Sequence, residues 1–194
     1  LDGGIYSGGA FVDDDGTEYE LEVLSTLEYN GFTYEVHGGK ATITGTTYTN
    51  PNYLEIPAKV DDYPVVSIGA SAFAGCSKLE EVRISDLSAW LSITFHNEKS
   101  NPLSNDAVLY IGEALLEDLV IPKGCEEIPL YAFVGCRSIR NVTIPKGVIR
   151  IQAFAFCRCV NLRQITIPNT VKYIANDVFY NCDSLASITY HGTP

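Results

Sequence analysis

Apolar residues recur at a spacing of 23 residues through the second half of the chain. The aligned positions are Leu119, Val142, Ile165 and Ile188; Ile121, Ile144, Ile167 and Tyr190; Phe133, Phe156 and Phe179; and Cys136, Cys159 and Cys182. A period between about 20 and 50 residues is typical of proteins built from stacked repeats. One repeat cannot bury its own apolar face, so the pattern predicts coils that stack and share a continuous core.

Each unit also predicts its own local structure. Ile165-Thr166-Ile167 alternates apolar, polar and apolar residues, which is the pattern of a strand with one buried face. Pro168 follows directly and has no N–H to donate to a ladder, so the strand should end there. Phe179 and Cys182 lie three residues apart, as in one helical turn that points two side chains inward. Successive coils should therefore place equivalent strands side by side in a parallel sheet, about 4.8 Å apart.

The repeat extends upstream with changes in length. We expect a solenoid over residues 51–194, with units at 51–78, 79–115, 116–138, 139–161 and 162–184 and a partial unit at 185–194. The 79–115 unit is the longest and carries Trp90 and a loop-like stretch at Asn97–Asp106. Within it, Leu109–Ile111 followed by Gly112-Glu113 predicts a strand and a tight turn.

Two runs of alternating apolar residues flank Gly38-Gly39. The apolar positions are Phe32, Tyr34, Val36, Ala41 and Ile43. Two glycines between alternating runs are a strong signal for a β-hairpin. We expect residues 32–50 to form a hairpin cap, because the first coil would otherwise leave its core open to water.

Residues 1–31 are predicted to form an acidic N-terminal segment, either a tether or part of the cap. Asp13-Asp14-Asp15-Gly16 has the residue types of a calcium loop. An EF-hand loop that began at Asp13 would need a glutamate at its twelfth position, where this chain has Leu24. We therefore interpret the acidic run as a solvated turn.

The formal net charge of −11 narrows the range of partners. Residues 1–50 hold nine acidic residues and one Lys, which together contribute −8. Nucleic acids and anionic membrane surfaces are unfavourable partners for such a chain, because both are bound mainly through Lys and Arg. We expect no binding of nucleic acid and no direct insertion into a membrane, since no run of 18 apolar residues is present. The chain begins at Leu1 and has no Met, so we expect a fragment or processed product, with its signal and anchor elsewhere.

Four of the six cysteines share one repeat position. They are Cys76, Cys136, Cys159 and Cys182. Neighbouring coils would bring these residues within the distance of a disulfide, but equivalent positions in parallel coils point their Cβ atoms the same way. We expect free, buried thiols in this column. Cys157 and Cys159 form a C-x-C pair, and alternation of side chains predicts that Cys157 is the exposed thiol.

Motifs that would indicate catalysis or metal binding are absent from the sequence. His37, His96 and His191 fall in the cap, the irregular loop and the chain end, whereas structural zinc needs four convergent ligands. The chain has no G-x-S-x-G elbow, no phosphate loop and no H-E-x-x-H helix. We expect no catalytic residue, no metal site and no cofactor, and therefore a protein that is not an enzyme.

The unit resembles the BspA-type leucine-rich repeat. The pattern L-x-x-L-x-L occurs at Leu79–Ile84, Leu116–Ile121, Ile139–Ile144 and Leu162–Ile167. An Ala-Phe-x-x-Cys segment occurs at Ala72–Cys76, Ala132–Cys136 and Ala155–Cys159, and Val178–Cys182 departs from it only at the first position. The resemblance covers about residues 32–194. It implies an α/β-type solenoid wound as a right-handed superhelix, strand-rich, with a parallel sheet and short helical turns.

The outward residues of the strands give the candidate binding face. Solenoids commonly bind partners on such a sheet face. The candidate residues are Glu81, Arg83, Asp118, Val120, Asn141, Thr143, Gln164, Thr166, Ser187 and Thr189. Small polar residues are also what a solvated sheet would carry, and the loop at residues 96–107 is a second candidate.

The resemblance implies a bacterial or protozoan cell-surface protein with a role in adhesion. We therefore expect a non-catalytic, secreted or cell-surface module that binds a host or matrix protein or a glycan. The alternative is a structural spacer or stalk within a larger surface protein. A gene that continues with more repeats and a separate binding or anchoring module would favour the spacer.

Overall fold

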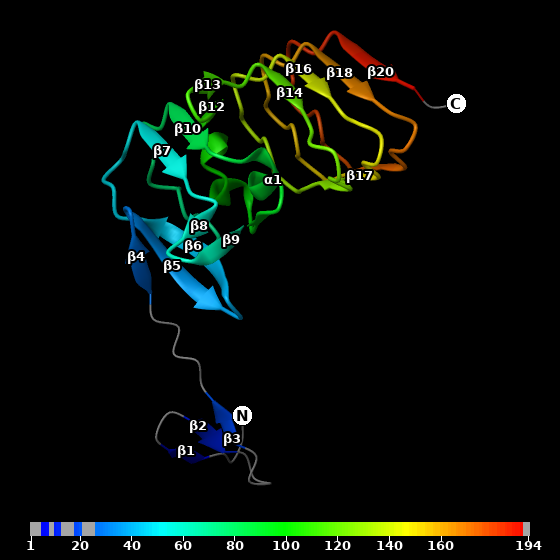
Figure 1. The fold of residues 1–194 in the computed structure, drawn as a ribbon. Helices are drawn as coiled ribbons and strands as arrows, with labels where there is room; N and C mark the ends of the chain where they lie inside the picture. Colours follow the sequence, from blue (N-terminus) through cyan, green and yellow to red (C-terminus); the bar gives the residue numbers. More distant parts are fainter. Residues whose placement is uncertain (1–4, 8–9, 13–17, 21–25, 192–194) are drawn as a thin grey trace.

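The chain folds into a strand-rich solenoid of about seven turns with little helix (Figure 1). The structure, a computed structural model, describes residues 5–7, 10–12, 18–20 and 26–191. The stacked coils that the 23-residue spacing predicts are therefore present.

Two sheets follow one another along one side of the solenoid, at the top of Figure 1. The first has the order β13-β12-β10-β7, with β7 at Tyr53–Ile56, β10 at Glu81–Ile84, β12 at Val108–Ile111 and β13 at Ala114–Leu115. The second has the order β14-β16-β18-β20, with β14 at Asp118–Val120, β16 at Asn141–Thr143, β18 at Gln164–Ile167 and β20 at Ser187–Tyr190. Every pair is parallel except β12–β13, which is the predicted strand and tight turn.

The prediction of one continuous sheet is wrong at residues 112–117. Strand β13 turns back antiparallel to β12 and occupies the edge at which β14 would have paired. The first sheet ends there, and a second sheet begins at β14, which pairs only with β16 among the described strands.

Shorter strands line the other side of the solenoid. β15 (Glu127–Ile128), β17 (Arg150–Ile151) and β19 (Tyr173–Ile174) form a parallel sheet of two-residue strands. Between the two sides, four of the described coils make a tight turn, in which the Cys N–H donates to the Phe carbonyl three residues earlier at 3.0–3.2 Å. The spacing of Phe and Cys therefore does mark a helical turn, although it is a single one.

A β-hairpin covers the first coil. β5 (Phe32–His37) and β6 (Lys40–Thr46) are antiparallel, and both residues of the connecting Gly38-Gly39 have positive φ, 55° and 71°. Two-residue hairpin turns of this type require positive φ at both positions, so the sequence prediction is confirmed for its stated reason. On its outer side β5 pairs with β4 (Leu27–Tyr29).

The hairpin is hydrogen-bonded into the solenoid. β6 runs parallel to β9 (Tyr63–Ile68), which in turn pairs with β11 (Thr94–Phe95) and with β8 (Lys59–Val60). The cap thus joins the sheet opposite β7 and leaves the outer edge of β7 unpaired among the described residues.

Three short strands near the N-terminus form a separate antiparallel sheet. They are β1 (Ile5–Ser7), β2 (Ala10–Val12) and β3 (Glu18–Glu20). The Asp13–Gly16 run, interpreted above as a solvated turn, lies outside the described residues.

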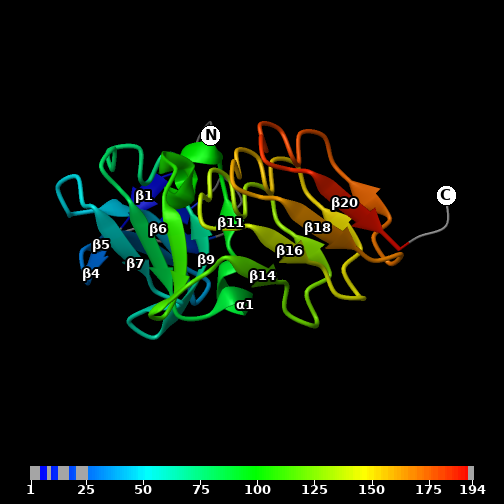
Figure 2. The same cartoon turned by 90° about the horizontal axis from the view of Figure 1, so that it is seen from above.

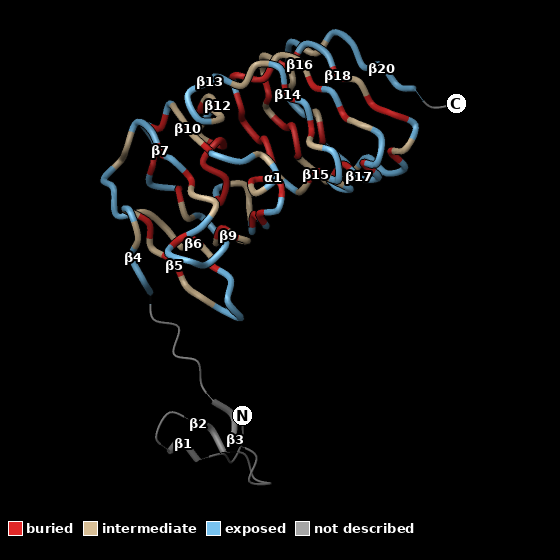
Figure 3. Tube along the Cα trace, viewed as in Figure 1, coloured by how far each residue is buried: buried red, intermediate tan, exposed pale blue. Residues whose placement is uncertain are grey.

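The core is a continuous column between the two sides, visible as red segments in Figure 3. Phe133, Phe156 and Phe179 stack in register, with ring centroids 5.4 Å and 6.0 Å apart and planes within 13° of parallel. The strand pairs place Leu119 beside Val142 and Val142 beside Ile165, as the spacing of 23 predicts. The alignment of coils inferred from the sequence is therefore confirmed.

The long coil contains most of the helical residues. Helix α1 spans Leu87–Trp90, and two 3-10 turns follow at Glu98–Ser100 and Pro102–Asn105. Asp86 caps α1 by accepting hydrogen bonds from the N–H groups of Ser88 and Ala89.

Candidate functional site

Eight of the ten candidate face residues lie together on four neighbouring strands. They are Asp118, Val120, Asn141, Thr143, Gln164, Thr166, Ser187 and Thr189. The ladder registers them in pairs across β14, β16, β18 and β20, which Figure 2 shows side by side. Because strand side chains alternate, Leu119, Val142 and Ile165 between them point inward and belong to the core, whereas Ile188 on the last strand is 52% exposed.

Glu81 and Arg83 do not continue this ladder. They lie on β10 in the first sheet, where their neighbours are Tyr53 and Glu55 on β7 and Val108 and Tyr110 on β12. The candidate face therefore does not continue as one ladder from β10 to β14. Alternation around the apolar Leu109 and Ile111 could have found Val108 and Tyr110 on the same face.

The second-sheet face is flat and weakly charged. Asp118 is its only ionisable side chain, and it accepts a hydrogen bond from the side-chain amide of Asn141. Val120 is 60% exposed, which makes it the main apolar contact available on this face. At the start of the strands, the Arg140 Nε donates to Glu117 at 2.7 Å.

The first-sheet face carries more charge. Arg83 lies 3.1 Å from Glu81 and 3.0 Å from Glu113, and its guanidinium carbon is 5.1 Å from the centre of the Tyr110 ring. The hydrogen bond that Arg83 donates to Glu81, together with the charge of Glu113, raises the pKa of Arg83. Both acids hold this guanidinium against the sheet, so it is not a free cation for a ligand.

The loop at residues 96–107, the second candidate, packs into the solenoid instead of projecting from it. Ser100, Asn101, Leu103 and Ser104 are buried. The Asn101 side-chain amide donates to the carbonyls of Tyr131 and Ala132 at 2.8 Å and 3.0 Å. The Trp90 indole donates to the same Ala132 carbonyl at 3.0 Å.

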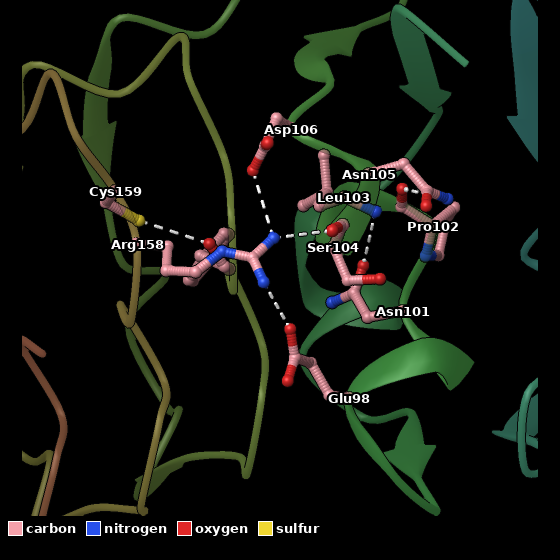
Figure 4. A network of polar contacts seen from close by, with 10 residues as sticks. Glu98, Asn101, Pro102, Leu103, Ser104, Asn105, Asp106, Arg158 and Cys159 are labelled. Atoms are coloured by element: carbon pink, nitrogen blue, oxygen red, sulfur yellow. Dashed lines mark hydrogen bonds and ion pairs between the residues drawn. The ribbon is translucent and has the colours of Figure 1, made fainter. Parts of the chain in front are cut away.

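Arg158 fastens this loop to the coil beyond it, as Figure 4 shows. Its guanidinium contacts Glu98 at 2.5 Å, Asp106 at 3.0 Å and the Ser104 carbonyl at 2.6 Å. Gly135 lies under the same loop, and a Cβ there would be 2.6 Å from the Leu103 carbonyl. These contacts indicate that the loop joins two coils and is not an open binding site.

All six cysteines lie within the described residues and are free thiols. Cys76, Cys136 and Cys159 are buried and Cys182 is partly buried, as the column predicts. Burial raises the pKa of each of these four thiols, and that of Cys182 reaches about 11. The Cys159 and Cys182 thiols donate to the carbonyls of Phe133 and Phe156 in the preceding coil, at 3.1 Å and 3.0 Å.

The prediction that Cys157 is an exposed thiol is wrong, because this side chain is only 6% exposed. Residues 154–159 form a turn, and Phe154 and Arg158 have positive φ of 57° and 59°. The alternation of a strand does not apply there, so both cysteines of the C-x-C pair are buried.

In the described part of the chain, no three side chains of His, Cys, Asp or Glu are grouped so that they could hold a metal ion. His96 lies 3.0 Å from the Ser67 hydroxyl, on the side of the first coils. No helix among the described residues is long and apolar enough to cross a bilayer.

These features define a leucine-rich-repeat solenoid with a flat sheet face. The sequence model of the BspA type leucine rich repeat region matches residues 47–113 and 107–193 in six copies. The chain belongs to the BspA-type leucine-rich-repeat family.

Two solved structures with a TM-score above 0.5 share this fold. A leucine-rich repeat protein from Bacteroides ovatus is 26% identical, with a TM-score of 0.56, over 84% of this chain and 40% of that one. The leucine rich repeat protein of T. pallidum is 23% identical, also with a TM-score of 0.56, over 84% of this chain and 71% of that one. A leucine rich cell surface protein from Faecalibacterium prausnitzii is 24% identical, with a TM-score of 0.47, over 87% of this chain and 55% of that one. No curated protein sequence matches the chain.

Proposed function

We propose that this chain is a non-catalytic module, secreted or displayed on a bacterial cell surface, that binds a host or matrix protein or a glycan. The observation that carries the proposal is the ordered row of exposed and half-buried side chains on β14, β16, β18 and β20. Family membership supports the surface location. The proposal includes the right-handed, α/β-type superhelix that the family resemblance implies.

The face is suited to a broad, shallow contact. Four strands spaced about 4.8 Å apart make a platform about 14 Å wide, which stacked coils hold rigid. Rigid platforms lose little conformational entropy on binding, which favours affinity even where side chains are small. Hydroxyl and amide groups supply both donors and acceptors, so the face can serve polar ligands such as glycans or protein backbones.

The test is a comparison of two variants with equal added charge. Thr143→Lys with Thr166→Lys changes the face, and Asn169→Lys with Tyr173→Lys adds the same charge in the turn after β18 and on β19 of the opposite sheet. Both variants and the parent are applied to arrays of extracellular matrix proteins and glycans. We expect the face variant alone to lose the ligands that the parent binds. Equal binding by both variants would refute a role for the face, and no ligand for any of the three would favour the structural spacer.

A further inference from the structure

Strand β7 ends the first sheet with an unpaired edge. Among the described residues it is paired only with β10, through a parallel ladder in which Leu54 faces Val82. The N–H of Glu81 donates to the Asn52 carbonyl at 3.1 Å. Since successive peptide groups of a strand alternate in direction, Asn52, Leu54 and Ile56 face β10, and Tyr53 and Glu55 direct their N–H and C=O groups outward.

A groove of about 390 Å³ runs along this edge, between β7 and the hairpin cap. In Figure 1, β7 is the leftmost of the upper strands, and β4 and β5 of the cap lie below it. The groove is lined by Tyr29, Asn30, Phe32, Tyr48, Lys59, Ser85 and residues 51–57. Three aromatic residues, from β4, from β5 and from the segment after β6, thus line the groove beside an open strand edge.

Tyr48 is a fixed wall of this groove although it is 51% exposed. Its hydroxyl donates to the Asn30 carbonyl at 3.2 Å, and its ring meets Phe32 edge to face, with centroids 6.4 Å apart. Gly31, at a φ of 79°, lets the ring lie directly on the backbone, because a Cβ there would be 2.3 Å from the ring. An exposed aromatic ring held on three sides is preorganised for contact with a ligand.

We propose that an extended polypeptide segment of a partner protein adds to the outer edge of β7 as a further strand. The outward N–H and C=O groups of Tyr53 and Glu55 offer donors and acceptors at the repeat of another backbone, which is the chemistry of strand addition. A glycan has no such regular series of amide groups. The site lies in the first sheet, so it is independent of the second-sheet face proposed above.

The side chains on both sides of the edge define the residue pattern of the segment. Glu55 is exposed on the outer face, and the whole chain has a net charge of −11, so the residue beside Glu55 should be Lys or Arg. The residues before and after it turn toward the groove, where the rings of Tyr29 and Tyr48 offer apolar surface. The segment therefore has the pattern apolar, basic, apolar.

The first experiment uses a fluorescent heptapeptide, Ser-Thr-Val-Lys-Val-Thr-Ser, with the whole chain, and follows anisotropy. Two derivatives carry N-methyl groups on the odd or on the even residues. An added strand uses only alternate N–H groups, so we expect one derivative to bind at least tenfold more weakly and the other to bind within threefold of the parent peptide. Absence of saturable binding by the parent peptide, or equal effects of both derivatives, would overturn strand addition.

The second experiment exchanges charges. We expect Glu55→Lys to weaken binding of the heptapeptide about fivefold and to strengthen, by a similar factor, binding of the derivative with Glu in place of Lys. Glu127→Lys on β15 makes the same charge change on the opposite side and should alter neither affinity. Equal effects of the two substitutions would mean that net charge, not the β7 edge, governs binding, and would overturn the proposal.

Two other occupants of the edge give distinct results. A second copy would appear as a dimer in sedimentation velocity at tens of micromolar, lost in the Glu55→Pro variant, which removes an outward N–H. Glycan binding at the groove would be lost in Tyr48→Ala and would not be displaced by the heptapeptide. Either result, in place of peptide binding, would overturn the assignment to a peptide.

Discussion

Truncation of Phe156 to Ala should be among the most destabilising single changes in the solenoid. The ring is fully buried and stacks on Phe133 at 5.4 Å and on Phe179 at 6.0 Å. Loss of a buried phenyl ring costs about 3–5 kcal/mol, from the lost transfer free energy and the cavity left behind. Because Phe156 has a ring on each side, two stacking contacts are lost, and the upper half of that range is expected.

Urea denaturation of the parent, Phe156→Ala and Phe179→Ala measures this cost. Phe179 is only partly buried and stacks on one described neighbour, so its truncation should cost about 1.5–3 kcal/mol. Phe156→Leu preserves most of the volume and should cost less than half as much as Phe156→Ala. A Phe156→Ala variant no less stable than Phe179→Ala would refute the shared core of stacked coils.

Three further predictions concern the loop contact, the cap and the thiols. Arg158→Ala should lower the unfolding free energy, measured by urea denaturation, by about 1–2 kcal/mol. Arg158→Gly should be about 1 kcal/mol more stable than Arg158→Ala, because residue 158 has a φ of 59°. The hydrogen bond to Asp61 and burial raise the pKa of Tyr34 to about 12. The unfolding free energy should therefore decrease less steeply above pH 10 in Tyr34→Phe than in the parent. Stability from this group is complete below pH 10 and is lost as the pH rises toward 12, at up to about 1.4 kcal/mol per pH unit. In the native protein, maleimide should modify Cys125 and Cys182 first, and the four buried cysteines only after unfolding. Mass spectrometry of proteolytic digests identifies the labelled residues.

Each of these outcomes has a clear opposite. Equal stability of the two Arg158 variants would mean that the positive φ costs nothing at this position. If the unfolding free energy of Tyr34→Phe fell with pH as steeply as that of the parent, the Tyr34–Asp61 hydrogen bond would not be the source of the loss. Rapid labelling of Cys157 in the native protein would mean that this thiol is exposed, as the alternation of side chains predicts.

The sequence specified those features that depend on a period or on a single residue type. The spacing of 23 placed Phe133, Phe156 and Phe179 in one stack, because coils of equal length keep equivalent side chains in register. Gly38-Gly39 specified the hairpin, because few other residues adopt positive φ twice in succession. In both cases local pattern and tertiary contact favour the same structure.

Features that depend on unequal coil length could not be predicted in this way. The coil at residues 79–115 contains an extra hairpin strand, β13, and the sheet breaks beside it. The fate of the loop at residues 96–107 depends on contacts of Asn101 and Arg158 with other coils, which no local pattern contains. The residues of the candidate face therefore lie side by side within the equal coils, and their register is broken across the unequal one.

The turns of the solenoid show what Cys contributes beside Phe. The strands are held by ladders, whereas three backbone bonds align the turn at residues 131–135 with the next coil. The N–H groups of Tyr131, Phe133 and Gly135 donate to the carbonyls of Ala153, Ala155 and Cys157, at 3.3, 2.8 and 2.8 Å. The Cys159 thiol adds a bond in the opposite direction, to the Phe133 carbonyl at 3.1 Å. A side chain small enough for the core that also carries a donor meets both needs, whereas Val would fill the space and leave the carbonyl with one bond fewer. The thiols of Cys159 and Cys182 therefore add to the alignment of the turns, and both remain free thiols.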